Sequence, residues 1–221
     1  MRTLLLLVLI YTLPSHALDI GGSPAQLRFF VGTQKVSPGE VNDVLKADGV
    51  DSYSSISTYG IEGTYQIVPR LNVGVRGEGK WQKVKETASP PANTQNPYYS
   101  SLQQSAALLV ARVDLVTGAV FRMDAFGAAG TAATSMDIRG PAGDSKYSHA
   151  MSSIVYEAGA SIGVGWGNMY FSVEAGNEWN KINGLTKTGA SSSALTAIDL
   201  SGGFLTIGVL FNGLPSWIHR K

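Results

Sequence analysis

Apolar and polar residues alternate along most of this chain, and that alternation predicts β-strands. Within residues 109–127, Arg112, Asp114, Arg122 and Asp124 share one face, and the opposite face is apolar. A reversal midway would set Arg112 opposite Asp124 and the other two charged residues opposite each other. Antiparallel strands favour such opposite-charge pairs. The pattern therefore predicts a hairpin with one charged face and one apolar face.

The same alternation recurs elsewhere in the chain and predicts eight strands in all. A turn centred on Pro69 would place Glu62 opposite Arg76, which repeats the charge pairing of the first hairpin. In the last strand the apolar phase changes at Gly202-Gly203, which predicts a β-bulge. The expected strands cover residues 25–34, 55–67, 71–83, 105–115, 120–130, 153–165, 169–180 and 194–211.

The connections between these strands are expected to alternate between long and short. Tight turns are expected at every second joint, one of them Gly167-Asn168. This arrangement is typical of an all-β, eight-stranded antiparallel up-and-down transmembrane β-barrel, and strands of about ten residues match a tilted bilayer span. The expected long polar connections are residues 35–51, 84–101, 131–148 and 181–193.

Alternation alone also fits a soluble, lipocalin-like barrel, which buries its apolar face. Opposite-charge partners on the polar face favour the inverted arrangement, because unpaired charges in a confined lumen are costly. Glycines on that face and aromatic residues near the strand ends favour it as well. We therefore predict a lumen charge network formed by Arg28, Glu62, Arg76, Glu78, Arg112, Asp114, Arg122, Asp124, Glu157 and Glu174.

The first residues have the features of a secretory signal peptide. Arg2 precedes an apolar run, and Ser15-His16-Ala17 forms a small-x-small cleavage site. We expect residues 1–17 to be the signal peptide, 18–211 the barrel and 212–221 a short periplasmic tail.

The signal peptide, the amphipathic strands and the closing stretch GFLTIGVLF resemble small bacterial outer-membrane β-barrels of the OmpA, OmpX and OmpW class. The resemblance covers about residues 25–211 and departs from the class after Phe211, where such barrels usually end. It implies the outer membrane of a Gram-negative bacterium, with long loops extracellular and both termini periplasmic. Outer-membrane lipid is then a partner.

The composition excludes several classes of function. A net charge of +1 gives no argument for nucleic acid, and the chain has no cysteine. No cluster has metal-ligand spacing, so we expect no metal and no cofactor. His149, Ser152 or Ser153, and Glu157 could be cast as the triad of a lipid-modifying enzyme, but no spacing supports it. We expect no catalytic residues.

Small residues are unusually frequent on the apolar face of the predicted strands four to seven. Small residues on a membrane face permit the close approach of a second surface. A homo-oligomer packed through this face and an accidental patch tolerated in lipid both remain open. The candidate oligomer face consists of Ala107, Ala111, Ala125, Ala129, Ala158, Ala160 and Ala175.

Three functions follow from this reading. The preferred one is a structural or surface-interaction barrel whose lumen is plugged by paired charges, since eight strands leave an interior that side chains fill. The first alternative is a porin-like pore for ions or small hydrophilic solutes. The second is an outer-membrane lipid-modifying enzyme.

Overall fold

The computed structural model describes residues 25–85, 98–140, 143–189 and 195–213. The expected signal peptide and nearly all of the expected tail lie outside these residues. No helix among the described residues is long and apolar enough to cross a membrane.

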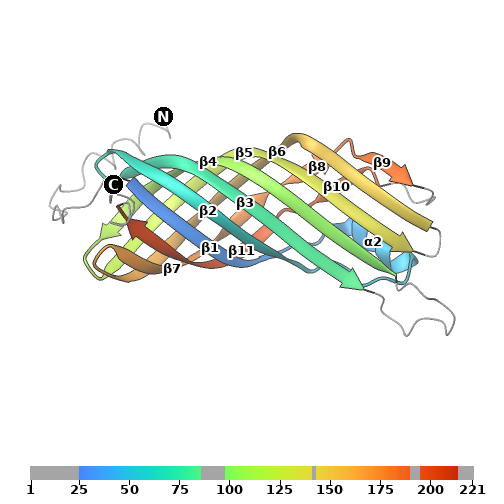
Figure 1. The fold of residues 1–221 in the computed structure, drawn as a ribbon, viewed down its shortest axis with the longest axis horizontal. Coiled ribbons are helices and arrows are strands. Elements are labelled where there is room, and N and C mark those ends of the chain that lie inside the picture. The colour runs from blue at the N-terminus through green and yellow to red at the C-terminus, as the bar shows by residue number, and fades with distance from the viewer. Residues whose placement is uncertain (1–24, 86–97, 141–142, 190–194, 214–221) are drawn as a thin grey trace, which may run out of the picture.

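Eight antiparallel strands form a closed ring, in which β1 pairs with both β2 and β11 (Figure 1). Tight turns join β2 to β3, β4 to β5 and β6 to β7 at one end, which we call the turn end. We call the other the cap end. The strands are β1 (Ala25–Lys35), β2 (Ser55–Val68), β3 (Leu71–Lys85), β4 (Tyr99–Thr117), β5 (Phe121–Gly140), β6 (Gly143–Trp166), β7 (Met169–Trp179) and β11 (Gly202–Asn212).

The outer wall of the barrel is apolar where a membrane would lie. Side chains such as Leu109, Val75 and Ile207 are more than half exposed. Aromatic side chains, including Tyr156 and Trp179 at opposed positions on β6 and β7, are exposed with them. Such a band cannot face water without a large cost, whereas hydrocarbon accommodates it. The barrel is therefore a transmembrane barrel with its polar face inward, and the soluble alternative is excluded.

The registers confirm one predicted charge pairing and correct the other. Glu62 lies directly opposite Arg76, as the turn at Pro69 predicts. In the β4–β5 hairpin, however, Arg112 lies opposite Phe126 and Asp114 opposite Asp124. The reversal is centred between Ala119 and Val120, beyond the middle of residues 109–127, and a bulge after Asp114 changes the register by one residue. The predicted direct pairing in that hairpin is therefore wrong.

The polar stretch 131–148 is not a loop, because β5 continues to Gly140 and β6 starts at Gly143. Buried side chains such as Met136 and Ile138 keep the period of two, while the outward side chains are polar. Outward positions beyond the lipid no longer need apolar residues, and the stretch therefore reads as a loop. The regular alternation of long and short connections is interrupted here.

The other polar stretches also contain regular structure at the cap end. Helix α2 (Gly39–Ala47) lies between β1 and β2, and β8 (Lys181–Asn183) and β9 (Thr186–Gly189) follow β7. The predicted last strand is divided, because β10 (Ala197–Asp199) pairs with β8 instead of joining β11. The predicted bulge is therefore replaced by a break in the strand.

A compact hydrophobic core closes the cap end. Helix α2 turns Val41 and Leu45 toward the barrel mouth. The Asn42 side chain donates to the carbonyl of Tyr53 at 2.9 Å and accepts from its N–H at 2.8 Å. The cap core comprises Val36, Val41, Leu45, Val50, Tyr53, Ile56, Leu102, Met136, Ile138, Tyr147, Ile182, Leu195, Ile198 and Leu200.

Candidate functional site

The structure buries all ten residues of the predicted charge network on the lumen side of the wall, each at most 9 % exposed. They come from seven of the eight barrel strands, so the network crosses the bore and does not follow one hairpin. Alternation places them inward, because residues separated by an even number of positions on one strand point to the same face.

Two arginines hold the centre of the network. Arg76 contacts Glu62 at 2.7 Å, Glu157 at 2.6 Å and Glu174 at 2.9 Å. Arg112 contacts Glu62 at 2.5 Å and Glu174 at 2.6 Å. Each guanidinium thus bridges strands on opposite sides of the ring, and buried charges of this kind require such partners.

Glu174 is the carboxylate with the most arginine partners described here. It is fully buried and accepts from Arg28 as well as from Arg76 and Arg112. The three arginines come from β1, β3 and β4, whereas Glu174 lies on β7. This one side chain therefore ties together most of the circumference of the barrel.

The charges of the β4–β5 hairpin pair diagonally across the strands. Arg112 contacts Asp124 at 2.6 Å, although the backbone sets it opposite another residue. Arg122 pairs with Asp114 and lies 3.6 Å from Asp124. The Asn72 amide donates to Asp114 at 3.0 Å. The expected partners therefore meet through long side chains that compensate for the shifted register.

The lumen contains a second charged group, which consists of Glu78 and two residues that the predicted network omits, Lys80 and Glu178. Lys80 pairs with Glu178 and lies 3.3 Å from Glu78. The Asn180 amide donates to Glu178 at 2.8 Å and to Gln104 at 2.9 Å. Strand alternation was the available signal, because Lys80 and Glu178 share a face with Glu78 and Glu174.

Three glutamates meet in this region, on three different strands. Carboxylate oxygens of Glu78, Glu157 and Glu178 lie within 4.8 Å of one another. Lys80 and Arg76 already supply positive partners to them. Sequence spacing could not indicate this cluster, because only closure of the barrel brings the strands together.

Aromatic side chains inside the barrel were not predicted. The Arg76 guanidinium lies 4.9 Å from the ring centroids of both Phe30 and Phe126, and the Arg112 guanidinium lies 4.5 Å from Phe126. Phe126 also belongs to an apolar cluster on the lumen side of β4, β5, β6 and β11. That cluster comprises Ala106, Leu108, Val110, Phe126, Ala128, Ala132, Val155 and Phe204.

The lumen cavities are small. One of about 10 Å³ lies beside Arg28 and Arg122, and another of about 10 Å³ lies between Phe30 and Glu157. A cavity of that size holds about one water molecule. The Arg28 Nη2 and Ser172 Oγ atoms at the first cavity have no hydrogen-bond partner among the residues that the structure describes, which suits a single water site.

The candidate triad residues have separate surroundings. The Nδ1 atom of His149 lies 3.3 Å from the carbonyl oxygen of Gly184. Ser153 is buried and donates to the carbonyl of Ala132 at 2.9 Å, and Glu157 is committed to Arg76. The side chain of Ser152 lies outside the described side chains.

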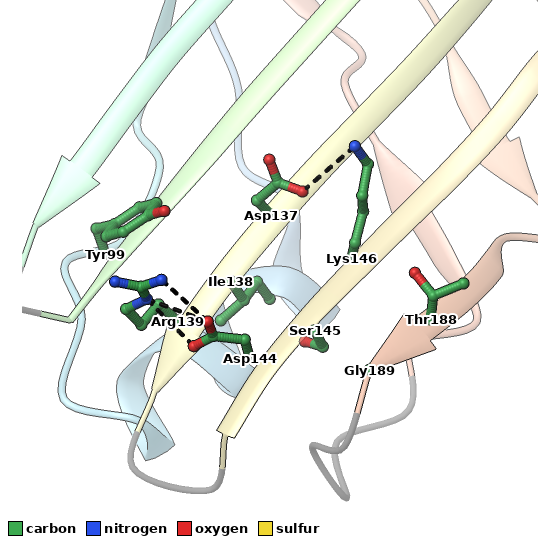
Figure 2. A pocket seen from close by; sticks show the side chains of 9 residues that line it. All are labelled: Tyr99, Asp137, Ile138, Arg139, Asp144, Ser145, Lys146, Thr188 and Gly189. Atoms are coloured by element: carbon green, nitrogen blue, oxygen red, sulfur yellow. Dashed lines mark hydrogen bonds and ion pairs between the residues drawn. The ribbon is translucent and has the colours of Figure 1, made fainter.

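A pocket of about 250 Å³ lies on the outer face of the sheet at the cap end (Figure 2). Arg139 donates to Asp144 at 3.0 and 3.2 Å, and this contact raises the pKa of the arginine. Lys146 lies 3.9 Å from Asp137, and the Arg139 guanidinium lies 5.5 Å from the ring centroid of Tyr99. The pocket therefore combines paired charges with one aromatic ring.

The predicted alanine face lies on the outer wall, and its members are exposed or half-buried. Ala160 lies opposite both Ala125 and Ala175, and Gly127 lies opposite both Ala111 and Ala158. The small residues therefore form one continuous patch across β4, β5, β6 and β7.

Solved structures of outer-membrane proteins share this architecture. OprG from Pseudomonas aeruginosa matches with a TM-score of 0.50 and 12% identity, over 86% of this chain and 96% of that one. The chain has the fold of small bacterial outer-membrane β-barrels. Neisserial surface protein A matches with a TM-score of 0.48 and 14% identity, over 87% and 99% of the two chains. The protease OmpT from Escherichia coli matches with a TM-score of 0.40 and 10% identity, over 90% of this chain and 99% of that one.

No protein-family model and no curated protein sequence matches the chain. At these identities the solved structures establish the fold and carry no activity to this protein. Its function therefore has to be argued from its own residues.

Proposed function

We propose that this protein is a non-conducting, non-enzymatic outer-membrane barrel of a Gram-negative bacterium, with a structural or surface-interaction role. In this proposal the turn end and both termini face the periplasm, and the cap end stands outside the cell. The observation that carries the proposal is that two separate groups of side chains block the bore of the barrel. Charged side chains cross it inside the membrane, and a hydrophobic core closes the cap end.

The filled lumen argues against the pore alternative. The paired side chains span the bore, and the apolar cluster on β4 to β6 adjoins them. An ion would have to displace buried ion pairs and then cross the cap core, whose buried side chains are mainly apolar. We therefore expect planar bilayers containing the folded protein to show no steady conductance. A stable open channel that responds to Arg112→Ala would contradict the proposal.

The cap end is the part suited to interaction. Strands β4, β5 and β6 continue past the lipid-facing wall, where β9 pairs with β6, and α2, β8 and β10 contribute residues to the core on their inner side. Rigid packing of this kind holds an exposed surface in one shape, which lowers the entropic cost of binding. The exposed carboxylates of α2, Glu40 and Asp43, belong to that surface.

Cysteine labelling of intact cells tests the orientation. A membrane-impermeant maleimide should label Asp43→Cys on α2 but not Ala119→Cys in the β4–β5 turn, because only the cap end faces the medium. The chain has no native cysteine to confuse the result. Labelling of the turn variant alone would indicate the opposite orientation and would remove the basis for a surface role.

The proposal includes a homo-oligomer packed through the alanine face. The patch around Ala125 and Ala160 supports close approach of a second wall, because small residues occupy the paired positions on β5, β6 and β7 there. Single variants Ala125→Cys and Ala160→Cys should give intermolecular crosslinks in membranes. Val75→Cys, on the lipid-facing wall of β3, is the matched control. Absence of any crosslinked dimer from both alanine sites would exclude this arrangement.

A further inference from the structure

Basic side chains gather on the outer face of the barrel near the cap end. Lys83 and Lys85 extend from β3, Arg139 from β5 and Lys146 from β6. The registers place Tyr99 of β4 between Lys85 and Arg139. The cluster is thus a product of four adjacent strands and not of one charged segment.

The Tyr99 ring organises two of these cations. The Lys83 Nζ atom lies 4.3 Å from its centroid, and the Arg139 guanidinium lies 5.5 Å away. Figure 2 shows the Tyr99 ring and Arg139 side by side at the edge of the pocket. Contact with an aromatic face holds a cation without neutralising it, so the Lys83 ammonium remains available to an anion.

Among the described residues of this face, positive charge exceeds negative charge. Asp144 pairs with Arg139, and Asp137 lies near Lys146. Lys83 and Lys85 form no ion pair with the carboxylates that the structure describes. Two positive charges are therefore left over beside the aromatic ring, which suits a phosphate group.

The cluster lies at the height of lipid headgroups. Exposed Trp81 precedes Lys83 by two residues on β3, and Trp side chains mark the membrane–water interface. At about 3.3 Å per residue, Lys83 stands about 7 Å and Lys85 about 13 Å beyond the tryptophan along the strand. Basic residues at this level lie beside the phosphates of the membrane lipids, which favours a lipid phosphate over a free solute.

A groove on the lipid-facing wall ends at Gly79, two residues before Trp81 on β3. Gly77 and Gly79 of β3 lie opposite Ala107 and Ser105 of β4, and the exposed Tyr59 ring lies over Gly79. These glycines and Ser105 line part of a broad, largely apolar groove of about 1120 Å³ on the outer wall. An acyl chain has the shape and polarity for such a groove.

We propose that this surface binds one phosphate-bearing lipid of the membrane. The phosphate lies against Lys83, Arg139 and Tyr99, and an acyl chain lies along the groove at Gly77 and Gly79. The site is on the outer wall and does not depend on the lumen or on a partner of the cap end. Its test therefore fails or succeeds separately from the tests of the proposed function.

Native mass spectrometry of the detergent-solubilised protein tests the headgroup. Phosphatidylglycerol and phosphatidylcholine with identical acyl chains are the probes, and the folded protein should retain more of the former. Removing one basic residue near a membrane surface costs about 1 kcal/mol, so Lys83→Ala should weaken phosphatidylglycerol retention about fivefold. The double variant Lys83→Ala/Arg139→Ala should abolish the preference. Lys46→Ala removes an exposed lysine from α2 and should change nothing.

One further variant tests the groove, and competition with inorganic phosphate tests whether the bound phosphate belongs to a lipid. A side chain at Gly77 meets only ordinary contact, 3.8 Å from Ile61 Cγ2, so Gly77→Leu should fold while filling the groove. This variant should lower the retention of both lipids and should leave the preference for phosphatidylglycerol unchanged. Inorganic phosphate at millimolar concentration should not displace phosphatidylglycerol. Equal retention of the two lipids by the wild type, full retention by the double variant, or displacement by phosphate alone would each overturn the proposal.

Discussion

The lumen inside the membrane and the core at the cap end are filled by opposite kinds of side chain. The lumen is crossed by arginine–carboxylate contacts, with Glu174 facing three arginines. The cap core is apolar, with Leu45 and Ile56 fully buried. Both seal the same barrel, but the wall outside the lumen faces lipid and the wall outside the cap faces water.

This difference shows what each environment demands. Strands in lipid must put apolar side chains outward, which leaves polar ones for the interior, and these must be paired. Beyond the lipid the same strands return to the ordinary arrangement with polar residues outside. The transition occurs within single strands: β5 has Asp124 inside near one end and Met136 inside near the other.

Removing the centre of the lumen network should have the largest effect. Glu174→Ala leaves three buried arginines short of a carboxylate, and breaking a buried ion pair costs about 3–5 kcal/mol. We expect a loss of this size in the free energy of unfolding, measured by urea titration in lipid vesicles. Ser172→Ala, two residues away on the same inner face, is the control. A Glu174→Ala barrel as stable as the control would show that the network adds little.

Truncating the cap core should be costly but local. Leu45 is fully buried between α2 and the barrel mouth, and Leu→Ala changes in cores cost about 2–5 kcal/mol. Leu45→Ala should speed hydrogen exchange in α2 and leave the strands in the membrane protected. Lys46→Ala, its exposed neighbour, should leave exchange unchanged. Equal loosening of the membrane strands would mean that the two regions unfold as one unit.

The cap should also loosen at high pH. Burial raises the pKa of the Tyr53 hydroxyl above its ordinary value of about 10. The neutral phenol is favoured in the folded cap, so this contribution is complete below the unfolded pKa and is lost as the pH rises through the folded value. The protection factors of the α2 amides, which are corrected for base-catalysed intrinsic exchange, should fall above about pH 10 in the wild type. Tyr53→Phe should not show that dependence, although it also loses the 2.9 Å bond to Ser100.

The smallest effect is expected on the surface of the cap. Arg139 and Asp144 form an exposed pair, and solvent screens such pairs strongly. Arg139→Ala should therefore leave the unfolding midpoint within error of the wild type. A clear loss of stability would indicate that this pair supports the extended hairpin of β5 and β6.

Much of the membrane-embedded part could be predicted from the sequence, because a period of two assigns each side chain to a face. The inward positions of Arg76 and Glu174 follow from that rule, and so does the opposition of Glu62 and Arg76. The cap end was misread because its outward positions are polar. There the alternation signal becomes weak, and short helices and strands look like loops.

The sequence by itself determined which face of each strand is charged and that the strands close into a ring. Only the tertiary structure decided which charges meet. Arg112 reaches Glu62 and Glu174 across the bore, and Lys80 reaches Glu178, through contacts between residues far apart in the chain. The physical reason is that periodicity is a local property of a strand. Partners across a lumen depend on register, bulges and closure of the whole barrel.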